Sequence, residues 1–396
     1  MQFFAIRNPE KVLFLLLLLL IATVSCIILD VLGRVPLYAR DEVLYIYVGK
    51  KYVEGTPPLR MNAEHPPLAK YFIGLFALYG FEKLYPYLST CITIAILYYI
   101  ATQILGTSSP AAFVTILAFF FDPVTISLAR CCMLDDAMLS FVALGTLFAL
   151  KWLKERKRIH YVLMGLMFGL ALACKLSSLY VVVPVVICVS YLASDRMVRK
   201  FLKNVFGCLS IASITFLTSF VADLVEGPRA LVDHLMFMVS YMSWRHGFSP
   251  IIALNGYLTF LAKLEVWKLV SVGTIVIANG TIVYSSFEHV GRAVMEFKPL
   301  LGSLSWPLLT VLVFKDFRSR FTNPFECVLA AWLLGGLASL IHGNIFWYYL
   351  LPLPPLYMLS LLERPRVAAI VASLNVAQVT IAVLGIATNI CLYATL

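Results

Sequence analysis

Residues 12–32 read VLFLLLLLLIATVSCIILDVL, and the rest of the chain is best understood from this run. A helix needs about twenty apolar residues to cross the hydrocarbon core of a bilayer, and the run is long enough. It is too long for the apolar core of a signal peptide, it has no small-residue cleavage site, and further apolar segments follow it. We therefore expect a first membrane-spanning helix here rather than a removed leader.

The composition extends this interpretation to the whole chain. Of the 396 residues, 61% are hydrophobic and 13% are charged, and the mean hydropathy is +0.90. Soluble domains carry charge on roughly a quarter of their residues. In lipid only helices and closed barrels satisfy their backbone polar groups, and the apolar runs are continuous rather than alternating, which favours helices. The sequence predicts one all-α polytopic membrane domain over residues 1–396.

Short basic clusters between the apolar segments predict the orientation. We expect about eleven spans, at 11–32, 84–105, 110–128, 135–153, 161–175, 177–193, 202–222, 299–315, 325–341, 345–362 and 367–392. The basic clusters all fall on one side of this arrangement: Arg7 with Lys11, Lys151 to Arg158, Arg196 to Lys203, Lys315 to Arg320, and Arg364 with Arg366. The positive-inside rule makes that side cytoplasmic, with the N-terminus inside and the C-terminus outside. The same clusters account for the net charge of +10, so we expect no nucleic-acid partner.

Two long segments, 33–83 and 223–298, then lie on the extracytoplasmic face. The first ends in a short interfacial helix from about Pro66 to Tyr79, in which the two prolines suit the first turn. The second contains two β-rich runs on either side of Asn279-Gly280, which predicts a small hairpin with a two-residue turn. The spans at 161–175 and 177–193 share one apolar stretch, so Lys175 between them should lie slightly below the outer surface.

Ionisable residues gather on that same outer face. Those at or near it are Asp41, Glu42, His65, Lys70, Asp122, Arg130, Asp135, Asp136, Lys175, Asp223, His246 and His342. Ionisable groups at membrane depth are costly, so by default they indicate function. Residues of both signs collected on one side are more typical of an outward-facing active site than of a path across the membrane.

The order of these residues resembles a known family. Asp41-Glu42 is followed by His65-Pro66-Pro67-Leu68-Ala69-Lys70, then Asp122-Pro123, then Arg130 ahead of Leu134-Asp135, then Gly169-Leu170-Ala171 leading to Lys175. This order is similar to that of the membrane glycosyltransferases of the protein O-mannosyltransferase type and of the bacterial aminoarabinose transferases, which share the GT-C superfold. Phe346 to Tyr349 running into Leu353-Pro354-Pro355 is similar to a late span of that family. The resemblance covers residues 35–195 and, more loosely, 240–360.

The resemblance implies a GT-C fold, a sugar donor linked to polyprenyl phosphate, and inversion at the anomeric carbon. It implies a hexose, mannose-like, moved to an extracytoplasmic hydroxyl of a protein Ser or Thr, a glycolipid or a glycan. Asp41 occupies the place of the family's base, which would take the acceptor proton; the alternative is a solvated loop carboxylate. Glu42 would either orient the acceptor or hold a neighbouring basic group.

A departing lipid phosphate gathers negative charge, which fixed cations would stabilise. Arg130 and Lys175 are the candidates, and Arg130 could instead form an ion pair with Asp135 or Asp136. Lys70 either approaches the phosphate or extends to the interface. Asp135 and Asp136 either position Arg130 near the substrates or cap the fourth span. Asp122, before a proline, is interpreted as a structural corner.

The remaining candidates would contact substrate. His65 either binds donor or acceptor or caps the interfacial helix. Trp244 and His246 belong to the outer loop that, in the resembled family, closes over the site. His342 and the aromatic run that includes Tyr348 would line a lipid groove or belong to an interfacial belt. No ligand spacing demands a metal, and Glu64-His65 alone is a poor site. We expect no required cofactor, while a divalent ion stays open.

Two other classes compete with an enzyme. A secondary transporter predicts ionisable residues near mid-membrane and matching discontinuous helices in two halves, and the sequence has neither. A non-catalytic lipid-binding or assembly subunit predicts that the Asp41→Asn variant stays functional. The cell membrane is the expected location in every case.

Overall fold

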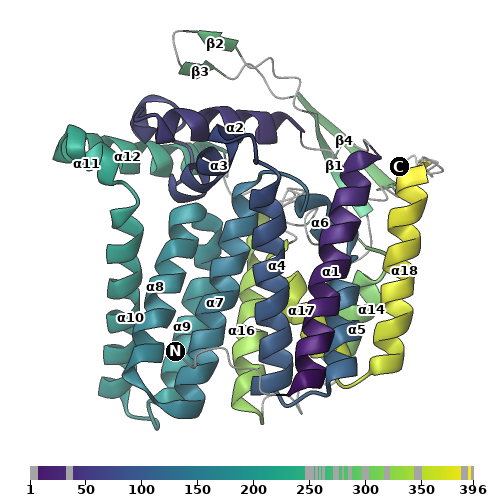
Figure 1. Ribbon diagram of the computed structural model, residues 1–396. Helices are drawn as coiled ribbons and strands as arrows, with labels where there is room; N and C mark the ends of the chain where they lie inside the picture. The colour runs from purple at the N-terminus through teal and green to yellow at the C-terminus, as the bar shows by residue number, and fades with distance from the viewer. Residues whose placement is uncertain are drawn as a thin grey trace.

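The computed structural model describes residues 8–32, 39–245, 254, 257, 260, 264–270, 276–278, 281–283, 288–296, 303–315, 322–342, 350–384 and 391–393. Most of these residues form a bundle of upright helices that stand side by side, and a layer of shorter helices and strands lies across one end (Figure 1). The predicted all-α membrane fold is therefore confirmed.

The upright helices follow the apolar segments of the sequence. They are α1 (Pro9–Val31), α4 (Leu84–Tyr99), α5 (Ser109–Phe120), α7 (Leu134–Glu155), α8 (Arg158–Cys174), α9 (Leu179–Ala193), α10 (Val198–Thr218), α14 (Trp306–Lys315), α16 (Pro324–Ala338), α17 (Leu353–Leu361) and α18 (Pro365–Leu384). Within the described residues, six helices are long and apolar enough to cross a membrane by length and composition, so the predicted number of spans stays a prediction.

Burial separates the centre of the bundle from its edge. In the most apolar window of α7, 83% of the residues are buried, against 22% in α1 and 11% in α10. α7 packs against α4, α8 and α9, whereas α10 lies at one side against α8 and α9. The exposed leucine, isoleucine and phenylalanine side chains of α1 and α10 suit contact with lipid tails, which replace protein as their apolar surroundings.

The turns that carry the basic residues at 151–158 and 196–203 lie at the same end of the bundle (Figure 1). Lys154 donates a hydrogen bond to the Gln103 carbonyl (3.2 Å), and Arg156 donates one to the Ala193 carbonyl (3.1 Å). These contacts join the turn after α7 to the ends of α4 and α9. The short helices and the strands lie at the opposite end (Figure 1).

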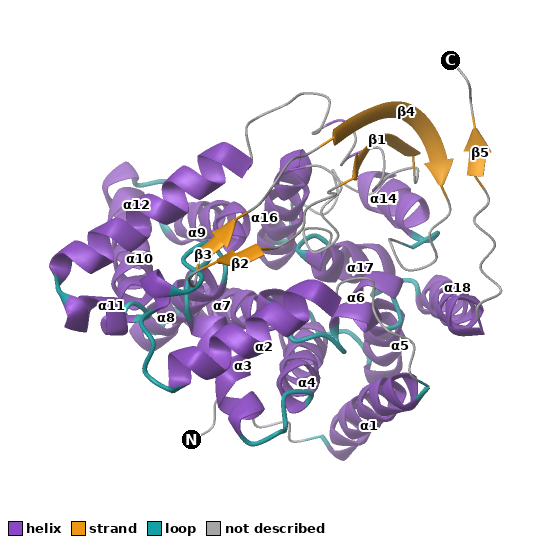
Figure 2. Cartoon of the chain, turned by 90° about the horizontal axis from the view of Figure 1, so that it is seen from above, coloured by secondary structure: helices purple, strands orange, loops and turns teal. Residues whose placement is uncertain are grey.

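That opposite end contains more helix than we predicted for the outer segments. The predicted interfacial helix is present as α3 (Leu68–Leu78), but residues expected to be loop form α2 (Ala39–Val53), η1 (Pro58–Arg60), α11 (Val221–Glu226) and α12 (Pro228–Arg245). Figure 2 shows α2, α11 and α12 lying across the tops of the upright helices. The helix at 39–53 was not predicted, because α2 gains a packing partner that the sequence alone does not reveal.

Glycines bring α2 and α3 into contact. A Cβ atom added to Gly74 would lie 2.0 Å from the Gly49 carbonyl oxygen, so only hydrogen at these positions allows the two backbones to approach so closely. A buried pair fixes the other side of the layer, since His234 Nδ1 lies 2.7 Å from Asp223 Oδ2 and the Leu59 backbone N–H donates to Asp223 Oδ1 (3.0 Å). These contacts hold α11, α12 and η1 together.

The strands lie beyond this layer. β2 (Val276–Ala278) pairs antiparallel with β3 (Thr281–Val283), with Ala278 opposite Thr281. This pairing leaves two intervening residues, as the hairpin prediction requires, although 279–280 themselves lie outside the described residues. β4 (Glu288–Glu296) pairs with β1 (Leu264–Val270) and β5 (Cys391–Tyr393). The predicted last span, 367–392, is thus too long, because α18 ends at Leu384 and 391–393 form a strand.

A buried carboxylate ties the middle of the chain to its last helices. Asp122 caps α6 (Pro123–Leu128) by accepting from the Val124 N–H (2.9 Å), which fits the predicted corner. Its other oxygen accepts from Trp306 Nε1 and from the Tyr357 hydroxyl, each at 2.7 Å. The predicted span 110–128 is therefore divided at Asp122 into α5 and α6.

We expect Asp122→Asn to lower the free energy of unfolding by about 3 kcal/mol, because one amide cannot accept from all three buried donors. Thermal unfolding of the detergent-purified protein measures the change. The matched control is Asp233→Asn, whose side chain is 56% exposed and which should shift stability by less than about 0.5 kcal/mol. Equal midpoints for the two variants would contradict the role given to Asp122.

Candidate active site

The first turn of α2 presents the acidic pair to the end of the bundle. Asp41 is half-buried and Glu42 is buried. Glu42 Oε1 accepts hydrogen bonds from Lys83 Nζ (2.8 Å) and from the Cys132 backbone N–H (3.1 Å). Of the two predicted roles for Glu42, the structure therefore fits the one in which it holds a basic group.

Lys83 connects that pair to the loop that precedes α7. Its ammonium donates to Glu42 and also to the Arg130 carbonyl oxygen (2.8 Å). Burial alone would lower the pKa of Lys83, but its hydrogen bond to Glu42 and the charge of that carboxylate raise the pKa above the usual value. Lys83 therefore remains a cation between α2 and Arg130.

Arg130 is buried at the outer end of α1. Its Nε donates to Asp30 Oδ1 (2.8 Å) and its terminal nitrogen donates to the Leu29 carbonyl oxygen (2.9 Å). The Tyr87 hydroxyl donates to the second oxygen of Asp30. The expected alternative, an ion pair with Asp135 or Asp136, is wrong about the partner, because Asp30 on the first helix supplies the carboxylate.

Lys175 is buried, as predicted from its place between two short spans. Its Nζ lies 2.9 Å from both oxygens of Asp135, and both side chains are nearly inaccessible to solvent. Asp136 caps the start of α7 through the Met133 N–H (3.4 Å), which confirms its predicted capping role. Lys175 and Asp135 thus form a second buried ion pair, close to Asp136.

Tyr45 is a common neighbour of these groups. It lies on α2, one turn beyond Asp41, and is buried. Burial raises the pKa of Tyr45 well above 10, and the charges of Asp41, Glu64 and Asp135 raise it further. The carboxylate of Asp41 on α2 and that of Asp135 on α7 thus both act on the Tyr45 hydroxyl.

Lys70 does not extend to the interface as one alternative predicted. Its side chain is fully buried and donates to the Asn62 (2.6 Å) and His65 (3.0 Å) carbonyl oxygens. Burial lowers the pKa of Lys70 to about 7. An amine that is enclosed and only partly charged holds the 62–65 loop, and its predicted contact with a lipid phosphate finds no geometric support.

The structure describes the side chain of only some of the predicted substrate-contacting residues. His65 is half-buried and its ring meets that of Tyr241 on α12 edge to face, with centroids 6.3 Å apart. This contact joins the two outer segments. Trp244 lies in α12, but its side chain is outside the described residues, as are His246 and Tyr348. Their roles stay predictions.

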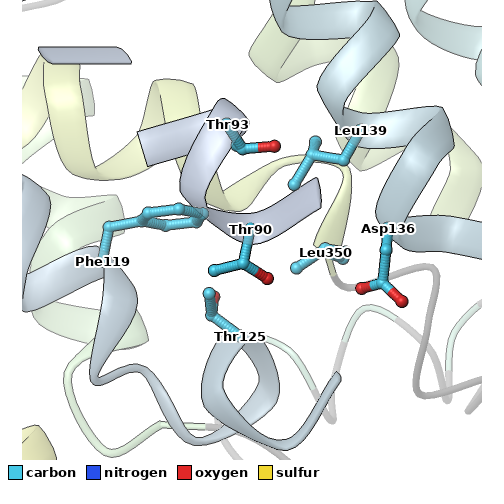
Figure 3. Close-up of a pocket in the computed structure, with 7 residues that line it drawn as sticks. All are labelled: Thr90, Thr93, Phe119, Thr125, Asp136, Leu139 and Leu350. Carbon is cyan, nitrogen blue, oxygen red and sulfur yellow. The ribbon is translucent and has the colours of Figure 1, made fainter. Parts of the chain in front are cut away.

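A small polar cavity lies under Asp136 (Figure 3). Its volume is about 20 Å³ and it is lined by Thr90, Thr93, Phe119, Thr125, Asp136, Leu139 and Leu350. Figure 3 shows the Asp136 carboxyl facing the same space as Thr90 and Thr125, and the Thr125 hydroxyl is buried without a hydrogen-bond partner. A space of this size and polarity suits a single water molecule.

A larger, apolar groove lies beside Arg130. Its volume is about 330 Å³, and it opens between the outer end of α1, the α5–α6 corner and α18. It is lined by Ser25, Ile28, Leu29, Leu32, Phe121, Ile126, Val376, Val379 and Thr380. Leu29 lines this groove, and its carbonyl oxygen accepts the hydrogen bond from Arg130, so the guanidinium contacts the backbone of a groove residue.

No group of three or more His, Cys, Asp and Glu side chains in the described part of the chain is placed to hold a metal ion. Sequence reasoning missed Lys83, Tyr45 and Asp30. The sequence did carry a signal for Asp30, which is an acid inside the apolar run 12–32, where a charge is costly and indicates function.

Comparisons with known proteins agree with this architecture. Residues 64–225 match the family model described as dolichyl-phosphate-mannose-protein mannosyltransferase. Asp41 and Glu42 precede that segment. The chain resembles ArnT from Cupriavidus metallidurans, solved bound to undecaprenyl phosphate, with a TM-score of 0.59, 17% identity and coverage of 87% of this chain and 59% of that chain.

A second solved structure is the protein O-mannosyltransferase Pmt1–Pmt2 complex of S. cerevisiae bound to its sugar donor, with a TM-score of 0.43, 16% identity and coverage of 64% of this chain and 37% of that one. No curated protein sequence matches the chain. Because this chain spans 59% of the length of the ArnT chain, the likeness concerns the fold. The chain therefore shares the fold of ArnT, and its residues 64–225 match the dolichyl-phosphate-mannose-protein mannosyltransferase family model.

Proposed function

We propose that the protein is an inverting glycosyltransferase that moves a hexose, mannose-like, from a polyprenyl-phosphate carrier to an extracytoplasmic hydroxyl. The observation that carries the proposal is the apolar groove whose lining residue Leu29 is hydrogen-bonded to Arg130. A polyprenyl phosphate has the matching form, an apolar chain with an anionic head. A planar guanidinium can bind two phosphate oxygens at once.

The acidic pair supplies the base for the reaction. The acceptor oxygen attacks the anomeric carbon from the face opposite the phosphate, the bond from that carbon to the phosphate oxygen breaks, and Asp41 takes the acceptor proton. Both bonding electrons leave with the polyprenyl phosphate, whose charge Arg130 stabilises. One base and attack from the opposite face give inversion.

Glu42 and Lys175 act in support of these two residues. Glu42 is engaged by Lys83 and by the Cys132 N–H, so it fixes α2 against the loop that carries Arg130. Lys175, paired with Asp135, keeps a second cation in the region without leaving a buried charge uncompensated. We propose that His65, Trp244 and His246 contact the acceptor and that Tyr348 contacts the lipid chain.

The membrane orientation is part of the proposal. The turns between α7 and α8 and between α9 and α10, which carry basic residues, lie at the end of the bundle opposite α2, the helix that carries Asp41 (Figure 1). Together with the positive-inside rule, this arrangement supports a cytoplasmic N-terminus and a site on the outer face of the cell membrane. The acceptor, a protein Ser or Thr, a glycolipid or a glycan, would then approach from outside.

Transfer of labelled sugar by the detergent-purified protein tests the proposal. We expect label to move from at least one polyprenyl-phosphate hexose to a hydroxyl acceptor in a panel of peptides, glycolipids and oligosaccharides. Proteoliposomes measure uptake of the same sugars in parallel. Uptake without transfer would favour a transporter, and binding of the lipid without either activity would favour a lipid-binding subunit; both results contradict the proposal.

A further inference from the structure

Arg130 already has an anionic partner in the structure. Its side chain is 8% exposed and that of Asp30 is 22% exposed, so the ion pair is largely withdrawn from water. The pair joins α1 to a loop a hundred residues further along the chain. An apolar membrane helix retains an acid at such a position at considerable cost, which indicates a role for it.

The ion pair lies next to residues of the apolar groove. Leu29 precedes Asp30 in the sequence, and Leu32 follows two residues after Asp30. Both leucines line the apolar groove. The guanidinium that donates to Asp30 also donates to the Leu29 carbonyl oxygen. A phosphate at the end of the groove would therefore meet the Asp30 carboxylate and Arg130 together.

Two anions on one buried guanidinium repel each other, and the repulsion is strong where water is scarce. Asp30 has a second hydrogen-bond donor, because the Tyr87 hydroxyl donates to its other oxygen. The carboxylate can thus give up Arg130 and still keep a hydrogen bond, which lowers the cost of releasing the cation.

We propose that Asp30 is the resident counter-ion of Arg130 and that the donor phosphate displaces it, so that Asp30 sets the affinity for the donor and the rate at which the lipid product leaves. The inference rests on the proposed function. In the empty site Asp30 neutralises Arg130. When donor binds, the phosphate takes over the guanidinium and Asp30 stays with Tyr87. After transfer, Asp30 competes again for Arg130 and helps to expel the polyprenyl phosphate.

Arg130 is also linked to the acidic pair Asp41 and Glu42. The Arg130 carbonyl binds Lys83, and Lys83 binds Glu42, the neighbour of Asp41. Arg130 therefore keeps its backbone position when its side chain changes partner. Asp30 is thus a positioning residue, which acts through Arg130 and need not touch the reacting carbon.

Binding of undecaprenyl phosphate to the purified full-length protein tests the exchange, with opposite results expected from two variants. Asp30→Asn removes the competing charge and should tighten binding about tenfold. Tyr87→Phe removes the donor that receives the displaced carboxylate and should weaken binding several-fold. A purely structural role for the cluster would weaken binding in both variants. With a sugar donor, Asp30→Asn should lower KM and kcat together, because product leaves more slowly.

Asp233→Asn controls for the loss of an exposed acid, and thermal unfolding midpoints control for folding. If Asp30→Asn does not fold, Asp30→Ser takes its place, with the same tighter binding expected. Unchanged or tighter binding by Tyr87→Phe also overturns the exchange. Unchanged or weaker binding by a folded Asp30→Asn overturns it as well, while wild-type binding leaves the proposed function standing. Failure of the wild type itself to bind undecaprenyl phosphate would overturn the proposed function and this inference together.

Discussion

Asp41→Asn is expected to lower kcat by a factor of about 10² to 10⁴, the range over which a positioned general base contributes. The amide keeps the size of the side chain but cannot take the acceptor proton as the new bond forms. Binding of the lipid donor should stay within about twofold, because Asp41 acts on the acceptor. Initial rates at saturating donor, together with binding of undecaprenyl phosphate, measure the two effects separately.

The matched control for Asp41 lies just after the same helix. Glu54 follows the last turn of α2 and forms an exposed ion pair with Lys51 (2.6 Å), so Glu54→Gln removes a carboxylate from the same region without touching the cluster. We expect the control to keep wild-type activity. An Asp41→Asn protein that folds and transfers sugar at the wild-type rate would show that another group is the base.

Arg130→Met should lower kcat/KM by a factor of about 10² to 10³, because the phosphate loses the cation that its departing charge requires. The substitution also strands Asp30 without its partner, and a buried carboxylate left alone is destabilising. Stability and activity must therefore be separated, and the protein offers a direct way to do so.

The double variant Arg130→Met with Asp30→Asn removes both charges at once. We expect its unfolding midpoint to recover toward that of the wild type while its activity stays as low as that of Arg130→Met. A charge change at an exposed position, Arg229→Met, serves as the control, since that side chain is 95% exposed. Recovery of transfer in the double variant would mean that Arg130 only holds α1 in place.

Much of the fold could be predicted because lipid imposes simple rules on sequence. Continuous apolar runs mark α1, α7 and α10, and the basic turns predict which ends of the helices lie together. The layer of short helices that carries the candidate site was harder to predict. Residues 39–53 are rich in tyrosine and valine and lack an apolar run long enough to signal a span. They become α2 by packing on α3 at Gly49 and Gly74, a contact between segments about twenty-five residues apart.

The end of the bundle at which the candidate residues lie could be predicted, but the pairs that they form could not. Asp41, Glu42, Arg130 and Lys175 do gather at one end of the bundle, as their positions relative to the spans indicate. Their partners come from distant parts of the chain: Asp30 for Arg130, Lys83 for Glu42 and Asp135 for Lys175. The spacing of residues along the sequence does not show which of them form ion pairs, because helix packing brings the partners together. For the same reason Lys70 was misjudged, since its burial depends on how the 62–65 loop folds over it.

Product analysis of a single reaction tests the proposed mechanism most directly. The wild-type protein is given a polyprenyl-phosphate hexose of one defined anomeric configuration with an accepted hydroxyl compound, and the products are examined by NMR and mass spectrometry. The mechanism predicts one polyprenyl phosphate released for each sugar transferred, and a glycosidic bond of the opposite anomeric configuration. Retention of configuration, or release of sugar without a polyprenyl phosphate product, would contradict it.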